Sequence, residues 1–269
     1  MIKIKFLLFL LVFPFILFSQ NKLPFEVGES CTYRIHYGPI TAGYGRLTIK
    51  NLEQHNNIEC FYFEGIGKSN SFFDLFFKVN DEYISYVNST SLSPVHFIRD
   101  VNEGGYIIKQ NYLFNAKENE VLAEDSIYQI PKQTQDMLSG FYFTRALLNN
   151  QNVQQDSIIK INVFMDEENY PMQIKYVKNE LIKTKWGKIN CMVFIPQLQE
   201  GRVFKDAEGM SIWISDDENK LMIKVETKII IGVIKAELSS FKGLKNPLSI
   251  RIAILYSPTI VGLSQIKLP

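Results

Sequence analysis

Three adjacent residues, Gly67, Lys68 and Ser69, match the end of a phosphate-binding loop, in which the lysine contacts phosphate oxygens and the hydroxyl holds magnesium. The complete loop needs a further glycine, with four residues between it and Gly67, and Tyr62 occupies that position. Without that glycine the backbone cannot wrap around a phosphate group. The sequence therefore predicts that the protein does not bind ATP.

The three histidines, His36, His55 and His96, are the side chains best suited to proton transfer near neutral pH. Two of them, His36 and His96, fall within predicted strands, and His55 lies in a polar turn. The sequence contains no Gly-x-Ser-x-Gly element that would present a serine nucleophile. We therefore predict no catalytic residue, and an envelope hydrolase with an unfamiliar site is kept as an alternative.

Two acidic clusters, Asp166–Asn169 and Asp216–Asn219, each lie between two predicted strands. Asp and Asn are favoured in tight turns, and neither cluster has the spaced oxygens and central glycine of a calcium loop. The spacings of Cys31, Cys60 and Cys191 match no zinc site and no redox pair. We predict no metal and no cofactor. Two readings of the cysteines stay open, one disulfide or three buried thiols.

Aromatic side chains make up 13% of the chain, and most of them must pack in its core. A curled sheet can also leave an apolar groove that the remaining aromatic side chains line. The residues that we expect to contact a ligand in such a concavity are Tyr33, Tyr44, Tyr106, Tyr142, Arg145 and Trp213. The expected ligand is apolar or derived from the cell envelope, either a lipid or a glycan-like molecule.

Arg145 lies in a predicted helix from Thr134 to Asn149, for which Thr134 is the expected N-cap. The residues that recur on one side of this helix are Met137, Leu138, Phe141, Arg145 and Leu148. A guanidinium on such an apolar side needs acceptors, because an unpaired buried charge is costly. We expect Arg145 to pair with a carboxylate, with backbone carbonyls or with an anionic group of a ligand.

Short runs of alternating polar and apolar residues, separated by turn residues, dominate the rest of the chain. They predict strands at Cys31–Tyr37, Gly43–Lys50, Ile58–Gly67, Glu82–Asn88, Val95–Asp100, Tyr106–Phe114, Val121–Ile130, Ile158–Met165, Met172–Val177, Leu181–Trp186, Ile189–Ile195, Ser211–Ser215, Leu221–Thr227 and Gly232–Phe241. Ser71–Phe77 is aromatic without alternation, and we read it as one or two helical turns capped by Asn70 or Ser69.

These elements predict a mainly antiparallel all-β fold, built as a curled sheet or open barrel with one main helix and one short helix. The alternative is two small β-barrels or sandwiches joined by the main helix. We expect a signal peptide over residues 1–19, a β domain over 20–247 with a subdivision near 134–155, and a tail over 248–269 whose structure stays open.

Export is predicted from the first residues, in which Lys3 and Lys5 precede the apolar run Phe6–Phe18 and the small residue Ser19. The run is short for a membrane-spanning helix, which needs roughly 20 apolar residues. Removal of this segment leaves 27 basic and 28 acidic residues, a formal charge of −1. We therefore expect a periplasmic or secreted protein with no basic surface for nucleic acid.

An ordered series of short stretches carries a resemblance to a known family. The stretches are Phe25–Glu29, Tyr33–Gly38, Ala42–Gly43, Phe72–Val79, Asn102–Tyr106, Asp136–Tyr142 with Arg145, Gly187–Cys191, Gly201–Arg202, Trp213–Asp217 and Gly232–Leu238. In this series the chain resembles the exported bacterial proteins of domain-of-unknown-function family 3108, from about Leu23 to Pro247. The resemblance implies export and β structure, and it supplies no catalytic residues.

Together, these patterns favour a non-catalytic periplasmic or envelope protein that binds its ligand in a β concavity. Two alternatives remain beside it. One is the envelope hydrolase, and the other is a structural or scaffold protein, which would expose a large apolar patch to its partner. The oligomeric state is not indicated by the sequence.

Overall fold

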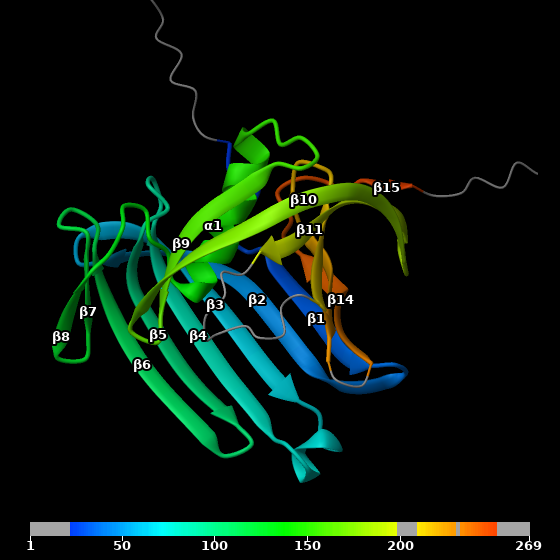
Figure 1. Ribbon diagram of the computed structural model, residues 1–269, viewed down its shortest axis with the longest axis horizontal. Coiled ribbons are helices and arrows are strands. Elements are labelled where there is room, and N and C mark those ends of the chain that lie inside the picture. Colours follow the sequence, from blue (N-terminus) through cyan, green and yellow to red (C-terminus); the bar gives the residue numbers. More distant parts are fainter. Residues whose placement is uncertain (1–21, 198–208, 230–231, 252–269) are drawn as a thin grey trace, which may run out of the picture.

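The computed structural model describes residues 22–197, 209–229 and 232–251. The strands in this part of the chain are β1 (Ser30–Tyr37), β2 (Ile40–His55), β3 (Ile58–Ser69), β4 (Val79–Asn88), β5 (Pro94–Glu103), β6 (Tyr106–Asn115), β7 (Glu120–Ala123), β8 (Ser126–Gln129), β9 (Ile158–Met165), β10 (Glu168–Thr184), β11 (Gly187–Gln197), β12 (Met210–Ser215), β13 (Met222–Lys228), β14 (Val233–Lys242) and β15 (Ile250–Arg251). They form one antiparallel sheet, which confirms the predicted fold class (Figure 1).

The first strand joins the two halves of this sheet. β1 pairs with β2 on one side and with β14 on the other, so that Tyr33 lies between Gly45 and Leu238. The strand order is β8-β7-β6-β5-β4-β3-β2-β1-β14-β13-β12-β11-β10-β9, and β15 pairs with β11 outside this path. The alternative of two barrels joined by a helix is therefore wrong, because backbone pairing runs through both halves.

The sheet curls until its two ends meet. The turn between β9 and β10 reaches the other half, where Asp166 accepts hydrogen bonds from Arg99 at 2.9 Å and Gln110 at 3.1 Å. Beside it, the Tyr128 hydroxyl donates to Glu167 at 2.9 Å. Figure 1 shows β9 and β10 crossing over the helix as a result. The hydrogen bonds of the acidic turn at Asp166 and Glu167 thus hold the two ends of the curled sheet together.

The main helix, α1 (Met137–Asn150), lies inside the curl and begins later than predicted. Its N-cap is Asp136, whose carboxylate accepts hydrogen bonds from the backbone N–H groups of Leu138 and Ser139. The expected cap, Thr134, instead donates its hydroxyl to the Pro131 carbonyl. Aspartate and threonine both cap helices well, so residue type alone could not distinguish Asp136 from Thr134 as the N-cap.

Several other boundaries differ from the prediction. The largest difference is in β2, which runs from Ile40 to His55 instead of from Gly43 to Lys50, so that His55 lies in a strand and not in a turn. Val121–Ile130 is two strands, β7 and β8, because the chain turns at Glu124, whose φ is +52°. The two strands predicted around Asn179 are one, since β10 bends at a bulge near Val177 and stays paired with β11.

Within Ser71–Phe77 the structure forms one 3₁₀ turn, η1 (Phe73–Leu75), whose N-cap is Phe72 and not Asn70 or Ser69. The Asn70 side chain still accepts hydrogen bonds from the N–H groups of Phe72 and Phe73.

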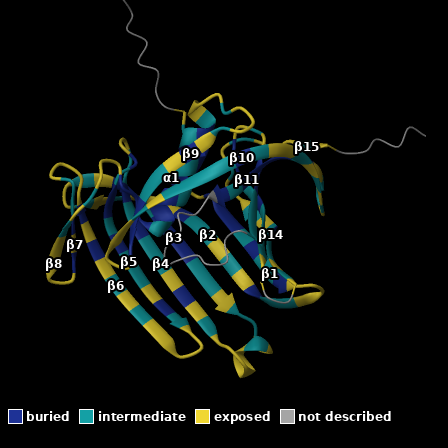
Figure 2. Cartoon of the chain, in the orientation of Figure 1, coloured by how far each residue is buried: buried dark blue, intermediate teal, exposed yellow. Residues whose placement is uncertain are grey.

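The largest core lies between α1 and the concave face of β2–β6. Phe25 and Tyr142 meet there edge to face at 5.3 Å, and Tyr142 stacks on Phe63 at 4.0 Å. Such ring pairs add to the free energy gained by burying their area. Figure 2 shows the accompanying alternation of buried and exposed residues along the strands. A second core lies under β11–β14 around Ile189, Cys191 and Trp213.

The predicted signal peptide over residues 1–19 lies outside the described residues. Of the tail, only its first residues are described, and Ile250 and Arg251 there add the short strand β15 to the edge of β11. Among the described residues, none of the helices combines the length and apolar character that crossing a membrane requires.

Candidate functional site

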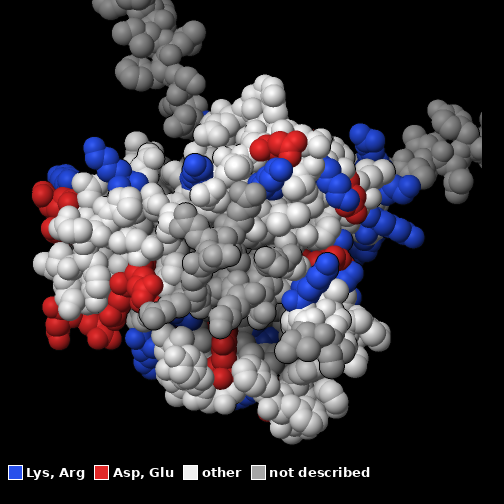
Figure 3. Space-filling model, viewed as in Figure 1, with Lys and Arg blue, Asp and Glu red and all other residues white. Residues whose placement is uncertain are grey.

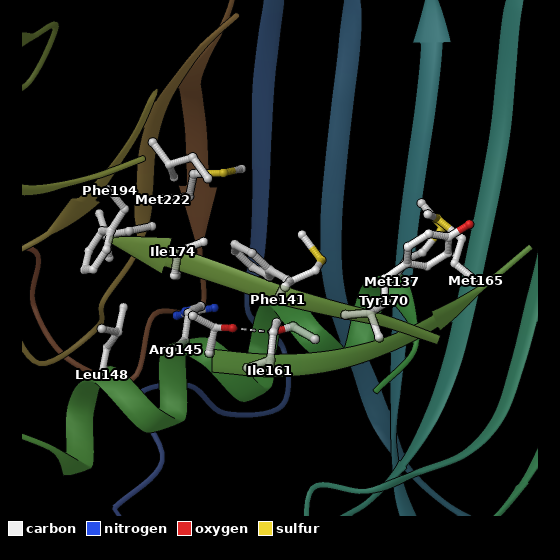
Figure 4. Close-up of a pocket in the computed structure, with 16 residues that line it drawn as sticks. Met137, Phe141, Arg145, Leu148, Ile161, Met165, Tyr170, Ile174, Phe194 and Met222 are labelled. Atoms are coloured by element: carbon white, nitrogen blue, oxygen red, sulfur yellow. Dashed lines mark hydrogen bonds between the residues drawn. The ribbon is translucent and has the colours of Figure 1, made fainter. Parts of the chain in front are cut away.

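An apolar pocket lies between α1 and the strands that arch over it (Figure 4). Its volume is about 260 Å³. The lining residues are Met137, Gly140, Phe141, Thr144, Arg145 and Leu148 from α1, Ile161, Val163 and Met165 from β9, Tyr170, Met172 and Ile174 from β10, and Phe194, Ile212, Ile214 and Met222 from β11–β13. Nearly all of these side chains are hydrocarbon or thioether, so the pocket suits an apolar ligand.

The local sequence places each wall of this pocket. On β9 and β10 the lining residues recur at every second position, which the pleat of a strand directs to one face. The pairs Tyr170–Val163 and Met172–Ile161 lie opposite each other across the two strands. On α1 the lining residues recur every three or four positions, as one side of a helix requires. The strand period of β9 and β10 and the helix period of α1 therefore each direct a row of side chains into the same cavity.

The polar atoms of the lining are engaged within the protein. The Thr144 hydroxyl donates to the Gly140 carbonyl one helical turn earlier, at 2.7 Å. The Tyr170 hydroxyl donates to Glu168 at 3.2 Å. Because these hydroxyls already have acceptors, the lining offers few free side-chain donors and is suited to apolar contacts.

Arg145 is the one charged residue of the lining, and it is 1% exposed. Its terminal nitrogens donate to both carboxylate oxygens of Glu29, at 2.5 and 3.0 Å. Its Nε and one terminal nitrogen also donate to the Asn219 carbonyl, at 3.3 and 2.9 Å. The prediction that Arg145 pairs with a carboxylate or backbone carbonyls is confirmed, since it has both.

The environment of this ion pair is aromatic as well as buried. The Arg145 guanidinium lies 5.4 Å from the ring centre of Phe25, 5.6 Å from that of Tyr142 and 5.7 Å from that of Phe141. Burial alone would lower the pKa of Arg145, and the Glu29 carboxylate more than offsets this, so that the pKa lies above its usual range. The guanidinium therefore stays charged, and Glu29 balances that charge.

The other predicted ligand contacts do not line this pocket. Tyr142 and Tyr33 are buried in the two cores, where burial raises the pKa of both phenols and keeps them neutral. Trp213 packs in the second core, with the Lys224 ammonium 3.7 Å from its ring centre. Tyr44 and Tyr106 are exposed on β2 and β6. The structure thus brings Tyr142 beside Arg145, places Tyr33 within electrostatic range of the same guanidinium, and leaves Tyr44 and Tyr106 apart on the surface.

The sequence did contain a signal for this pocket. Met137, Phe141, Arg145 and Leu148, which the periodicity placed on one side of α1, all line it. Only Leu138 of that predicted group packs in the first core instead. The contributions of β9 and β10 were not foreseen, because alternation shows which residues share a face but not what that face covers.

The three histidines lie away from the pocket. His96 is hydrogen-bonded to Asn111 at 2.6 Å, stacks with Tyr86 and lies at a tilt against His55, and burial lowers the pKa of His96. His36 is hydrogen-bonded to the Gly38 carbonyl and lies 3.3 Å from Glu237. The described residues contain no group of three or more His, Cys, Asp or Glu side chains that could hold a metal ion.

All three cysteines are buried and unpaired, so the second reading of the cysteines holds. Burial raises the pKa of Cys31 and Cys191 to about 12 and that of Cys60 to about 11. The thiolate is the reactive form, and the raised pKa values keep these thiols protonated near neutral pH. They act as small core side chains.

The fold and the pocket define a barrel-like β protein with a helix enclosed by its curled sheet. The chain belongs to the family described as "Protein of unknown function (DUF3108)", whose model matches residues 32–239. No protein with a curated description matches the chain.

Two solved structures are similar to the chain. A beta-barrel-like protein of the DUF1849 family from Brucella abortus is 8% identical, with a TM-score of 0.51 over 81% of this chain and 98% of that one. A DUF1089 family protein from Pseudomonas aeruginosa is 11% identical, with a TM-score of 0.39 over 78% of this chain and 94% of that one. At such identities the first likeness concerns the fold alone.

Proposed function

We propose that this protein is a non-catalytic binding protein of the bacterial cell envelope that holds a neutral, apolar ligand between α1 and the β9–β10 hairpin. The observation that carries the proposal is the pocket of about 260 Å³ whose lining is almost entirely apolar. None of its lining residues is a Ser, Cys, His, Asp or Glu, so no nucleophile or proton-transfer group of these types faces the ligand.

The state of Arg145 argues for a neutral ligand. An anionic ligand would have to compete with Glu29, whose carboxylate is already held by two hydrogen bonds in a buried site. Breaking such a pair strands a buried charge, which is costly. We therefore regard Arg145 as a tie between helix and sheet, and we do not assign it to an anionic headgroup.

The lining also favours a lipid over a glycan. A glycan needs many hydrogen-bond partners, and the side-chain polar groups of this lining are few and already engaged. Four of the seven methionines line the pocket: Met137, Met165, Met172 and Met222. Their flexible thioethers adapt to the shape of an apolar guest. The small volume suits a single acyl chain or a ligand of similar width.

We expect the uncharged fluorescent probe N-phenyl-1-naphthylamine to bind this pocket and to be displaced by dodecanol. Dodecanoate should compete no better than dodecanol, because the charge of Arg145 is balanced by Glu29. The substitution Met172→Trp places a bulky ring in the pocket and should weaken probe binding by roughly tenfold or more, through lost apolar contact area. Fluorescence titration measures the affinity of each protein for the probe, and displacement of the probe measures the affinities for dodecanol and dodecanoate.

The matched control is Met210→Trp, which makes the same change on β12 outside the pocket lining. It should leave probe affinity within about twofold of the native value. Equal weakening by both substitutions, or displacement by dodecanoate at a much lower concentration than by dodecanol, would contradict the proposal. Native mass spectrometry of protein purified from the envelope would identify a ligand retained from the cell.

Export is the second part of the proposal and rests on the predicted signal peptide. We expect the mature chain to begin near Gln20 or Asn21 in an envelope fraction, because Ser19 is a small residue at the end of the apolar run. N-terminal sequencing measures this directly. Recovery of a chain with intact Met1 from the cytoplasm would refute export while leaving the binding pocket untouched.

A further inference from the structure

A second cavity, of about 560 Å³, lies between the end of β10 and the strands β1, β13 and β14. Figure 1 shows β10 and β11 arching toward β14 at the right of the molecule. The lining shares no residue with the apolar pocket, although β13 contributes to both, Met222 to the pocket and Ile223 to this second cavity. We call it the basic cavity, because of the charges that its lining carries.

The described lining of the basic cavity carries four cations and one acid. Arg34 comes from β1, Lys183 from the end of β10, Lys185 from the turn after it and Lys224 from β13, and the acid is Glu237 of β14. Like charges gathered around one space repel one another, and a bound anion relieves that repulsion. The excess of positive charge therefore indicates an anionic ligand.

Two acids near Lys224 lie outside the lining, and each is balanced by a lysine that also lies outside it. Glu226 is paired with Lys235 at 2.8 Å as well as with Lys224 at 3.0 Å. Glu180, which is within electrostatic range of Lys224, is paired with Lys178 at 2.8 Å. These two acids therefore leave the excess charge of the lining in place.

The acids of the turn between β12 and β13 are engaged elsewhere. Asp216 is paired with Lys220 at 3.5 Å and accepts a hydrogen bond from the Asn190 amide at 3.1 Å. Asp217 accepts hydrogen bonds from the Ser215 hydroxyl at 2.7 Å and from the Ser249 N–H group at 3.0 Å. Neither carboxylate lines the basic cavity.

The acid of the lining, Glu237, offsets the charge of one cation. Its carboxylate lies 3.8 Å from the Arg34 guanidinium and 3.3 Å from Nε2 of His36. The first distance is too long for a hydrogen bond, and another terminal nitrogen of Arg34 donates to the Thr41 hydroxyl at 3.3 Å. A guanidinium has more N–H donors than this one contact uses, so Arg34 keeps donors for an oxyanion.

Lys183 and Lys185 are the cations most accessible to a ligand. Both are exposed, and neither forms an ion pair within the described part of the chain. The Lys185 ammonium lies 4.9 Å from the ring centre of Trp186, a contact that leaves its charge unbalanced. The stretch Leu181–Asn190 contains a third lysine and no acid. Figure 3 shows Lys and Arg side chains gathered at the right of the molecule, where β10 and β11 arch over.

The chemistry of the lining suits a small ligand that carries phosphate groups. Arginine binds phosphate oxygens through its planar fork, and lysine binds them as a point charge. Ile182, Ile223 and Leu238 supply an apolar wall for the organic part of such a ligand. The volume falls within the range of about 300–1,000 Å³ that is typical of small-molecule sites, and a flat bilayer surface does not enter such a concavity.

We propose that the basic cavity binds a small, soluble anion with more than one phosphate group, which Lys183, Lys185 and Arg34 contact. Three cations exceed the charge of a single phosphate monoester, which is roughly −1.5 to −2 at neutral pH. The site is independent of the apolar pocket, because the two linings share no residue. The protein then has two binding sites of different chemistry, one for a neutral apolar ligand and one for a polyanion.

The test is isothermal titration of the chain lacking its signal peptide with inorganic tripolyphosphate. The native chain should bind it at one saturable site, with an affinity that falls as potassium chloride is added. Lys183→Ala/Lys185→Ala should weaken binding by roughly tenfold or more, because two ammonium groups next to the anion are lost. Glu237→Gln should strengthen binding several-fold, because it removes the acid of the lining.

The matched control is Lys117→Ala/Lys132→Ala, which removes the same charge from two exposed lysines outside the lining. It should leave the affinity for tripolyphosphate within about twofold of the native value, because charges beyond a Debye length are screened. Circular dichroism should show the native fold in both double variants, since all four side chains are exposed.

Absence of saturable tripolyphosphate binding by the native chain would overturn the proposal, as would equal weakening by the two double variants or weaker binding by Glu237→Gln. Binding to phosphatidylglycerol vesicles that Lys183→Ala/Lys185→Ala abolishes, without any binding of tripolyphosphate, would overturn it in favour of a lipid headgroup. Binding of N-phenyl-1-naphthylamine must be unchanged in Lys183→Ala/Lys185→Ala, and tripolyphosphate binding unchanged in Met172→Trp. The failures of the two proposals are therefore distinguishable.

Discussion

Glu29→Ala should lower the free energy of unfolding by about 3–5 kcal/mol, because it leaves the Arg145 guanidinium buried without its counter-charge. For a domain of this size that loss corresponds to a fall in Tm of roughly 6–20 °C. Glu29 and Arg145 are each 2% exposed or less, so water cannot replace the missing partner. Thermal and urea unfolding, followed by circular dichroism, measure the change.

A double-mutant cycle separates the ion pair from the packing around it. Arg145→Met keeps most of the apolar stem and should also destabilise the fold, because Glu29 is then unpaired. Glu29→Ala/Arg145→Met should lose less than the sum of the two single changes, by at least about 2 kcal/mol, since neither charge remains.

The control for this cycle is Lys22→Ala, at an exposed ion pair with Glu218 in which both side chains are more than half exposed. It should change the free energy of unfolding by no more than about 0.5 kcal/mol. If Glu29→Ala behaved like this control, and Arg145→Met abolished ligand binding without lowering Tm, Arg145 would belong to the ligand.

Asp136→Ala is expected to cost about 2–4 kcal/mol, for two combined reasons. It removes the N-cap of α1, and it strands the buried Ser85 hydroxyl, which donates to Asp136 at 2.6 Å. Asp136→Asn should stay within about 1 kcal/mol of the native protein, because asparagine caps a helix as well as aspartate does and the Ser85 hydroxyl can turn to accept from the amide. Urea unfolding of both variants tests this order.

The native protein and Asp136→Asn should also differ in how their free energy of unfolding depends on pH. Burial raises the pKa of Asp136 above its usual range, against the opposing effect of the hydrogen bonds it accepts. The folded state therefore binds this proton more tightly than the unfolded state, and the contribution of Asp136 to stability falls as the pH rises from about 4 through its folded pKa.

Asp136→Asn has no such proton, so its free energy of unfolding, relative to that of the native chain, should rise across the same pH interval. Unfolding in urea at a series of pH values from acid to neutral measures the difference. A difference that stays constant, or that falls with pH, would show that the hydrogen bonds to the carboxylate outweigh its burial.

Much of the fold follows from patterns that act over a few residues. Alternation at Cys31–Tyr37 and Ile58–Gly67 locates β1 and β3 within two residues at each end, because one face of each strand is buried. Helical spacing finds the side of α1 that carries Phe141 and Arg145. The same patterns cannot show that the chain turns at Glu124, since a turn of this kind depends on backbone dihedral angles that several residue types can adopt.

The sequence by itself determined that the protein is an antiparallel β structure, that Arg145 lies on an apolar helix side, and that its charge must be satisfied there. The cause is local, because side-chain direction follows the period of the element and a buried charge needs a partner wherever it lies.

Only the tertiary structure decided which partner that is. Glu29 lies 116 residues before Arg145 in the chain, and the two meet because β1–β14 pairing and the curl of the sheet bring the N-terminal segment to α1. The pocket has the same origin, since its two walls face each other only after β9 and β10 fold over the helix. Contacts between distant segments depend on how whole elements pack, and short sequence patterns do not encode that geometry.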